Sequence, residues 1–225
     1  MKTPVVLTVL NNGVLGYQKE IPEEDVNLAR PLGAHTGLAF ELHFVNASAE
    51  SILREVWVNF MKNDTETLEI LGGLFMIGGQ FTIPPEASQT LNYSCELGDD
   101  ERRIVSIFGH RHANTDRFTV WSHRGGEKKL VYEDYDWDEP AELFYNSVIQ
   151  NGDPNPATNR PGGYSGILNL QAGDRLEWEC EVNNRSGVEL TFRNEVFTGE
   201  MCNIFGSTSG GARPIWFCAP PLVVK

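Results

Sequence analysis

Short apolar segments separated by glycine, proline and asparagine run along most of this chain, and this pattern restricts it to an all-β fold. The 225 residues include 22 glycines and 12 prolines, the residues that most strongly interrupt regular structure and mark turns. In residues 37–46 the apolar side chains alternate, with Leu38, Phe40, Leu42 and Phe44 on one face, as in a half-buried strand. No segment has a convincing helical period. We therefore expect an antiparallel β-sandwich of a jelly-roll-like kind.

About a dozen short segments have the composition of strands. They lie at residues 37–46, 51–61, 68–83, 91–95, 103–112, 118–122, 129–132, 143–149, 166–170, 175–182, 188–193, 201–205 and 214–218. The stretch 151–163 is rich in Pro, Gly and Asn, and we expect it to be a long surface loop of the kind that often borders a binding site.

The acidic balance of the chain argues against two classes of partner. The formal net charge is −13 at pH 7, whereas nucleic acids and anionic membranes bind basic surfaces. No segment approaches the roughly 20 consecutive apolar residues that cross a bilayer. The apolar run at residues 4–10 is too short for a signal-peptide core followed by a cleavage site. We expect no nucleic-acid partner and no membrane span.

The four cysteines, Cys95, Cys180, Cys202 and Cys218, bear on the cellular compartment. None of them forms a C-x-x-C motif, which argues against a zinc ribbon or a thioredoxin-like site. An even number of cysteines in an aromatic-rich β protein fits two disulfides and a secreted or periplasmic location. Four free buried thiols are the alternative.

Two short motifs far apart in the chain supply candidate metal ligands, GHRH at residues 109–112 and EMCN at residues 200–203. Residues two apart on a strand point to the same side, so His110 and His112 would share a face. Imidazole binds both oxidation states of copper, and a soft thioether selects Cu(I). If His110, His112 and Met201 converge, they predict one copper ion that can cycle between oxidation states.

Several motifs also occur in the same order as in a known enzyme family. In chain order they are Gly72-Gly73-Leu74-Phe75-Met76, Ile83-Pro84-Pro85, Cys95, His110-Arg111-His112, Ala172-Gly173-Asp174, Cys180 and Glu200-Met201-Cys202-Asn203. Over about residues 67–220 the chain resembles the C-terminal half of the copper type II, ascorbate-dependent monooxygenases, the enzymes that hydroxylate peptidylglycine and dopamine.

The resemblance implies a jelly-roll domain whose copper is held by His110, His112 and Met201. Oxygen would be activated there and a substrate C–H bond hydroxylated, with electrons from ascorbate or another small reductant. Part of the coordination shell would stay open for oxygen and water, as in other catalytic metal sites.

The resemblance also implies the cysteine pairing, Cys180 with Cys202 and Cys95 with Cys218. Cys180 lies on the apolar face of its predicted strand and would point into the sheet. A bridge from Cys180 to Cys202 would hold the backbone beside Met201 in place.

The chain departs from the family in its N-terminal part. The family has a first domain with an electron-supplying copper bound by three histidines, two of them adjacent, and this chain has no adjacent histidines. The resemblance implies that residues 1–66 form an N-terminal β segment similar to the end of that domain, and that residues 67–225 form the copper domain. His43 falls where the third histidine would lie, although we expect it to be an ordinary strand histidine. A partner chain or a homodimer would then complete the missing half, unless the chain is a truncated relative.

Two departures concern the substrate. Phe108 stands where the peptidylglycine enzymes have an arginine that binds a carboxylate, and Phe205 replaces a tyrosine. Asn203 matches their substrate-contacting asparagine. We expect Phe108, Asn203 and Phe205 to border a pocket for a small apolar substrate.

Two alternatives to this enzyme remain. The chain could be a non-catalytic copper-binding or partner-binding module, as the missing histidine pair suggests. It could also be a cupin, in which Asp116 would join the two histidines, but a cupin needs a later histidine and only His123 follows. Glu200 is either a solvated charge or a hydrogen-bond partner of a ligand histidine.

Overall fold

A computed structural model describes residues 27–35, 49–53, 68–138, 140–147, 162–163 and 166–219. The strands are β1 (Leu28–Ala29), β2 (Glu69–Met76), β3 (Thr82–Ile83), β4 (Ser88–Glu96), β5 (Arg102–Arg111), β6 (Thr115–Arg124), β7 (Glu127–Asp134), β8 (Leu143–Phe144), β9 (Gly162–Gly163), β10 (Leu168–Leu170), β11 (Arg175–Asn183), β12 (Leu190–Thr191), β13 (Cys202–Ser209) and β14 (Ile215–Cys218). The described residues contain no helix, and so none that could span a membrane.

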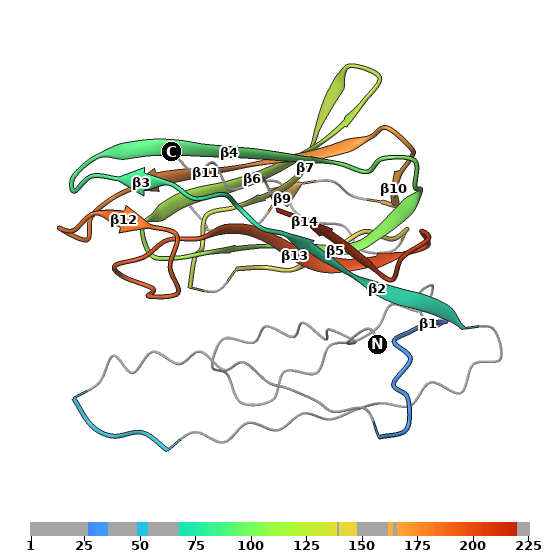
Figure 1. Cartoon of the computed structure of the whole chain (residues 1–225), viewed down its shortest axis with the longest axis horizontal. Helices are drawn as coiled ribbons and strands as arrows, with labels where there is room; N and C mark the ends of the chain where they lie inside the picture. Colours follow the sequence, from blue (N-terminus) through green and yellow to red (C-terminus); the bar gives the residue numbers. More distant parts are fainter. Residues whose placement is uncertain are drawn as a thin grey trace.

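The strands form two facing layers (Figure 1). One is a seven-stranded sheet in the order β1-β2-β13-β5-β10, with β14 also paired to β2 and β8 to β5. The other is a five-stranded sheet in the order β4-β11-β6-β7-β9, and β3 and β12 pair separately. All pairings are antiparallel except those of β1 and β14 with β2. The predicted all-β sandwich is thus confirmed, whereas its jelly-roll character stays a prediction.

Strand β11 shows how alternation in the sequence builds the core. Leu176, Trp178, Cys180 and Val182 are all buried, because alternate side chains of a strand point to one face of its sheet. The indole Nε1 of Trp178 donates a hydrogen bond to the carbonyl oxygen of Cys202 in the opposite sheet, at 2.9 Å. This contact ties the two layers together at the start of β13.

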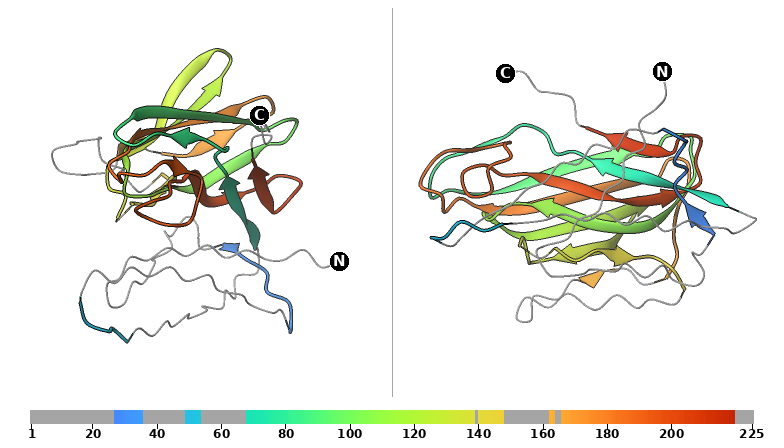
Figure 2. Two further views of the ribbon diagram at one scale, coloured as in Figure 1. Left: turned by 60° about the vertical axis from the view of Figure 1, so that its left-hand side comes forward. Right: turned by 90° about the horizontal axis from the view of Figure 1, so that it is seen from below.

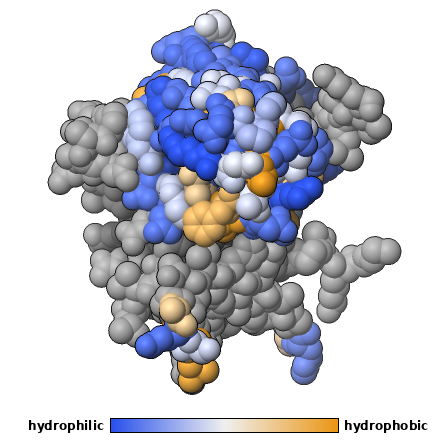
Figure 3. Space-filling model, turned by 90° about the vertical axis from the view of Figure 1, so that its left-hand side faces the viewer, coloured by the Kyte–Doolittle hydropathy of each residue, from blue (hydrophilic) through white to orange (hydrophobic). Residues whose placement is uncertain are grey.

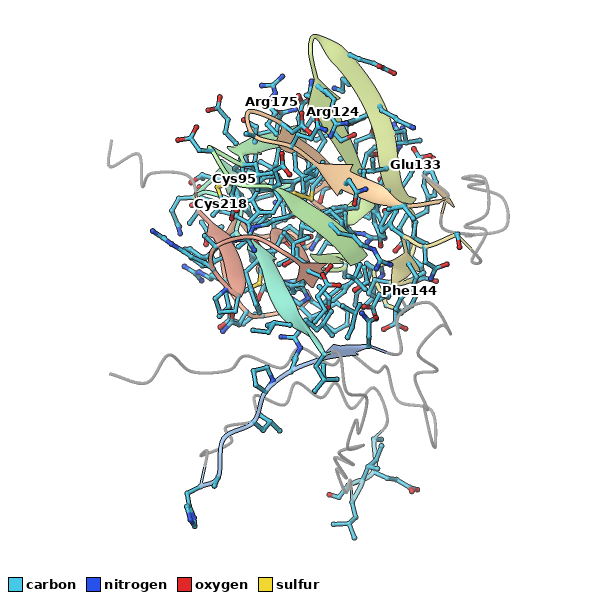
Figure 4. All side chains as sticks on the ribbon, turned by 90° about the vertical axis from the view of Figure 1, so that its right-hand side faces the viewer. Cys95, Arg124, Glu133, Phe144, Arg175 and Cys218 are labelled. Atoms are coloured by element: carbon cyan, nitrogen blue, oxygen red, sulfur yellow. A yellow bond between two sulfur atoms is a disulfide. The ribbon has the colours of Figure 1, made fainter. Side chains whose placement is uncertain are left out.

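Both predicted disulfides join the two sheets. Cys180 on β11 is bonded to Cys202 on β13, and Cys95 on β4 is bonded to Cys218 on β14 (Figure 4). All four cysteines are therefore paired, and the alternative of free thiols is wrong. Two disulfides are compatible with an oxidising, extracellular compartment.

Several strands differ in extent from the prediction. The single segment predicted at 68–83 is divided into β2 and β3, since residues 77–81 leave the ladder. Within the strand predicted at 143–149, β8 covers Leu143–Phe144, and residues 148–149 lie outside the described residues. Strand β13 continues beyond 205 to Ser209. Residues 37–46, with His43, and most of 51–61 lie outside the described residues. Of the predicted loop 151–163, only Gly162–Gly163 is described, as strand β9.

A described part of the N-terminal segment packs on the main domain. Strand β1 runs parallel to the start of β2, with Leu28 opposite Glu69 (Figure 2). The guanidinium of Arg30 then donates to the carbonyl of Gly72 at 3.1 Å and to the hydroxyl of Ser207 at 3.3 Å. The predicted boundary at residue 66 therefore separates two strands of one sheet.

Candidate metal site

The predicted site residues lie on or directly beside the central strands β5 and β13 of the seven-stranded sheet, with His112 following the end of β5 and Met201 preceding the start of β13. In the antiparallel register Phe108 is opposite Phe205, and His110 is opposite Asn203. Directly opposed residues project from the same face of a sheet. Ile107, the neighbour of Phe108, is fully buried in the core, so these four side chains lie on the face that points away from the core.

The two histidine rings lie side by side, as their spacing predicts. Their centroids are 5.6 Å apart, and two imidazoles that bind one ion through bonds of about 2 Å have centroids roughly 5–6 Å apart. Nδ1 of His112 lies 3.4 Å from the carbonyl oxygen of Gly199. A carbonyl oxygen only accepts, so this contact favours a proton on Nδ1 and a lone pair on Nε2, the usual arrangement of a metal-binding histidine.

Met201 joins the histidines on the same face. It precedes Cys202, which pairs with Arg111, so Met201 and His112 are the residues directly beyond the last pair of the ladder. Its Sδ atom is 3.6 Å from Nδ2 of Asn203, and Asn203 is the cross-strand partner of His110. The two imidazoles therefore lie next to each other, and the thioether lies beside Asn203, which is opposite His110.

The side chain of Glu200 forms hydrogen bonds with both segments that carry the candidate ligands. Its Oε1 accepts hydrogen bonds from the backbone N–H of His112 at 2.5 Å and of Met201 at 2.8 Å, and its Oε2 accepts from the N–H of Asn114 at 3.2 Å. Burial raises the pKa of Glu200 to about 7 despite these bonds. Glu200 is fully buried, so the expectation of a solvated charge is wrong. It binds the backbone of His112 rather than its ring.

The loop before Glu200 is attached to the segment that follows His112. The N–H of Ala113 donates to the carbonyl of Val196 at 3.3 Å, and Nδ2 of Asn114 donates to the carbonyl of Phe197, also at 3.3 Å. Phe197 is 55% exposed and packs edge-on against Trp137. The described surface at this end of the sandwich is otherwise mostly hydrophilic (Figure 3).

A buried ion pair lies on the opposite side of the H-x-H motif. Arg111 points into the core, as alternation requires for the residue between two outward histidines, and its guanidinium lies 3.3 Å from Oδ2 of Asp134 on β7. The hydroxyl of Tyr132 donates to the same oxygen at 3.0 Å. Burial, and then the charge of Asp134, raise the pKa of Tyr132 above its usual range. No pattern in the sequence predicted that Asp134 would pair with Arg111.

A row of phenylalanine rings crosses the outer face beside the histidines. The ring of Phe205 lies 5.5 Å from that of Phe75, 5.7 Å from that of Phe108 and 5.3 Å from that of His110. On the edge strand β14, Phe217 is the register partner of Phe75 and is largely exposed. Phe75 lies in a motif noted from the sequence, but its place in this row follows only from the register.

The donor set determines which metal fits. Within the described part of the chain, no group of three or more His, Cys, Asp and Glu side chains is arranged to hold an ion, so a site here depends on the thioether of Met201. Two imidazoles and one thioether suit copper better than zinc, calcium or magnesium.

The structure gives the cupin ligands other roles. Asp116 lies on β6 in the opposite sheet, and both its carboxylate oxygens bind Arg185, at 2.7 and 2.8 Å. His123, also on β6, faces the carboxylate of Glu177 at 2.8 Å. Neither residue is on the sheet that carries His110 and His112.

No protein-family model matches the chain, and no curated protein matches it. The family resemblance therefore rests on the ordered motifs of the sequence.

Proposed function

We propose that this chain binds one copper ion through His110, His112 and Met201 and acts as a copper-dependent monooxygenase. It would hydroxylate a C–H bond of a small apolar substrate with molecular oxygen and a reductant such as ascorbate. The observation that carries the proposal is the cross-strand arrangement, in which two imidazoles and one thioether share the outer face of paired strands.

The surrounding residues support a site of this kind. Gly199 orients the ring of His112, and Glu200 holds the backbone of His112 and Met201. Orientation of ligands by hydrogen bonds outside the coordination shell is a general feature of metal sites. Bound copper would supply one-electron chemistry and a position for oxygen.

The substrate class follows from the phenylalanines next to His110. Phe108, Phe205 and Phe75 present rings rather than charges on this face, and rings favour apolar or aromatic ligands. Because Phe108 replaces a carboxylate-binding arginine, a peptide with a free C-terminal glycine is disfavoured. We infer that Asn203 and the two rings of Phe108 and Phe205 border the substrate.

The source of electrons for the copper needs a separate explanation. Without adjacent histidines in its sequence, it lacks the family's second copper ligands. We propose that the reductant reaches the single copper directly, or that a partner chain or a second copy supplies the missing half. The disulfides agree with a secreted or periplasmic location.

The missing histidine pair also favours a second candidate, a copper-binding or partner-binding module without turnover. Oxygen uptake distinguishes the two. The copper-loaded chain would be mixed with ascorbate and small aromatic compounds, with His110→Ala as the control. Reductant-dependent oxygen uptake and a hydroxylated product support the enzyme. One bound copper without product supports the copper-binding module. The absence of bound copper contradicts both copper-dependent functions and leaves only the partner-binding module.

A further inference from the structure

The oxygen and the nitrogen of the Asn203 side-chain amide each contact a different partner. Its Oδ1 accepts a hydrogen bond from the backbone N–H of Gly78 at 2.8 Å, and its Nδ2 lies 3.6 Å from Sδ of Met201. A backbone N–H can only donate, so it must face the amide oxygen, and the NH₂ group is thereby directed at the sulfur. Asn203 is 2% exposed, so this contact is shielded from bulk water.

The anchor at Gly78 depends on a close backbone approach. A Cβ atom on this residue would lie 2.6 Å from the carbonyl oxygen of Cys202, the residue between Met201 and Asn203. Cys202 itself is held by its disulfide to Cys180. The close approach at Gly78 and the disulfide at Cys202 therefore hold the amide of Asn203 in a fixed position beside the thioether.

We propose that Asn203 is a positioning residue for the Met201 thioether. Its N–H···S hydrogen bond occupies one lone pair of the sulfur and restricts rotation of the methionine side chain, while the second lone pair serves the metal. This inference rests on the proposed copper site, and it gives Asn203 a role apart from substrate contact. Because thioethers select Cu(I), the effect falls on the reduced state.

The substitution Asn203→Leu tests this role, since leucine has a similar size and no hydrogen-bonding group. The affinities for Cu(I) and Cu(II) would be measured separately by competition with chelators. We expect the Cu(I) affinity to fall about tenfold, the effect of losing one hydrogen bond, with little change for Cu(II). A tenfold loss confined to Cu(I) lowers the midpoint potential of the one-electron couple by about 59 mV.

A double-mutant cycle separates this role from a general structural one. In a Met201→Leu background the same Asn203→Leu change should leave both copper affinities unaltered, because the sulfur is already absent. An equal loss of Cu(I) and Cu(II) affinity, or the same loss in both backgrounds, would overturn the proposal.

A second variant keeps the test decisive if Asn203→Leu does not fold. In Asn203→Asp the carboxylate still accepts from Gly78 but has no N–H for the sulfur. The added negative charge is present both with and without Met201, so the difference in copper affinity between the two backgrounds isolates the amide–sulfur contact.

If the unaltered chain binds no copper, the proposed copper site itself is wrong. If it binds copper through sulfur and Asn203→Leu changes neither affinity, only the role of Asn203 is wrong.

Discussion

The carboxylate of Glu200 accepts a hydrogen bond from the backbone N–H of His112, with 2.5 Å between Oε1 and the nitrogen. The same oxygen binds the N–H of Met201 at 2.8 Å, so one buried side chain joins the two segments that carry the candidate ligands. Because Glu200 bonds to both backbones, it fixes the positions of His112 and Met201 relative to each other.

Replacement of Glu200 by glutamine should destabilise the protein and weaken copper binding. Whichever way the new amide turns, its NH₂ group meets at least one backbone N–H, so a buried donor is left unsatisfied. We expect the free energy of unfolding to fall by about 1–3 kcal/mol, as measured by denaturant titration without metal. The matched control is Glu195→Gln in the exposed part of the preceding loop, which should change stability little. Equal stabilities of the two variants would contradict this role.

Replacement of Asp134 by asparagine should be costly, because Arg111 would then be a buried charge without its counterion. The two side chains are 0% and 1% exposed, and removal of one member of a buried pair typically costs about 3–5 kcal/mol. Thermal and urea unfolding would measure the loss. The exposed Asp99→Asn serves as the control. A loss below about 0.5 kcal/mol, the range of ordinary surface substitutions, would show that the pair contributes little.

The two disulfides should differ in their effect on copper. Both double serine variants, Cys95→Ser with Cys218→Ser and Cys180→Ser with Cys202→Ser, should lose about 2–5 kcal/mol of stability. Only the second pair adjoins Met201, so only that variant should also bind Cu(I) more weakly once folded. Copper affinities would be compared below the unfolding temperature of both variants. Equal copper affinities would mean that the disulfide does not support the thioether.

Asp174 should make the stability of the domain sensitive to acid. Burial raises the pKa of Asp174, but hydrogen bonds from Arg124 and from the N–H of Gln171 outweigh it, so the pKa is lowered overall. A carboxyl group whose pKa is lower in the folded state stabilises the fold above its unfolded pKa of about 3.9, and this contribution disappears as the pH falls through the folded pKa.

The variant Asp174→Asn tests this linkage. It should be less stable than the unaltered chain at pH 7, and the difference in the free energy of unfolding should shrink as the pH is lowered below about 4. Denaturant titrations at several pH values would measure it. A difference that is independent of pH would show that the charge of Asp174 is not involved.

The sequence predicted features that depend on local alternation or spacing. The buried face of β11 and the shared face of His110 and His112 both follow from the two-residue period of a strand. The supports of the site were not predictable in the same way. Asp134 reaches Arg111, and Gly78 reaches Asn203, through sheet register and packing between segments distant in the chain, and no local pattern encodes such pairs. The buried role of Glu200 was likewise hidden, because adjacency to Met201 alone does not distinguish a solvated carboxylate from one that binds three backbone N–H groups.

X-ray absorption on the copper-loaded, ascorbate-reduced protein tests the central claim most directly. All four cysteines are in disulfides, so a sulfur neighbour on the metal would have to be a methionine. The account predicts one sulfur at about 2.3 Å, together with two imidazole nitrogens, and the loss of that sulfur in Met201→Leu, a volume-conserving change that should cost less than about 1.5 kcal/mol. Reduced copper with only nitrogen and oxygen neighbours, or a sulfur that persists in Met201→Leu, would contradict it.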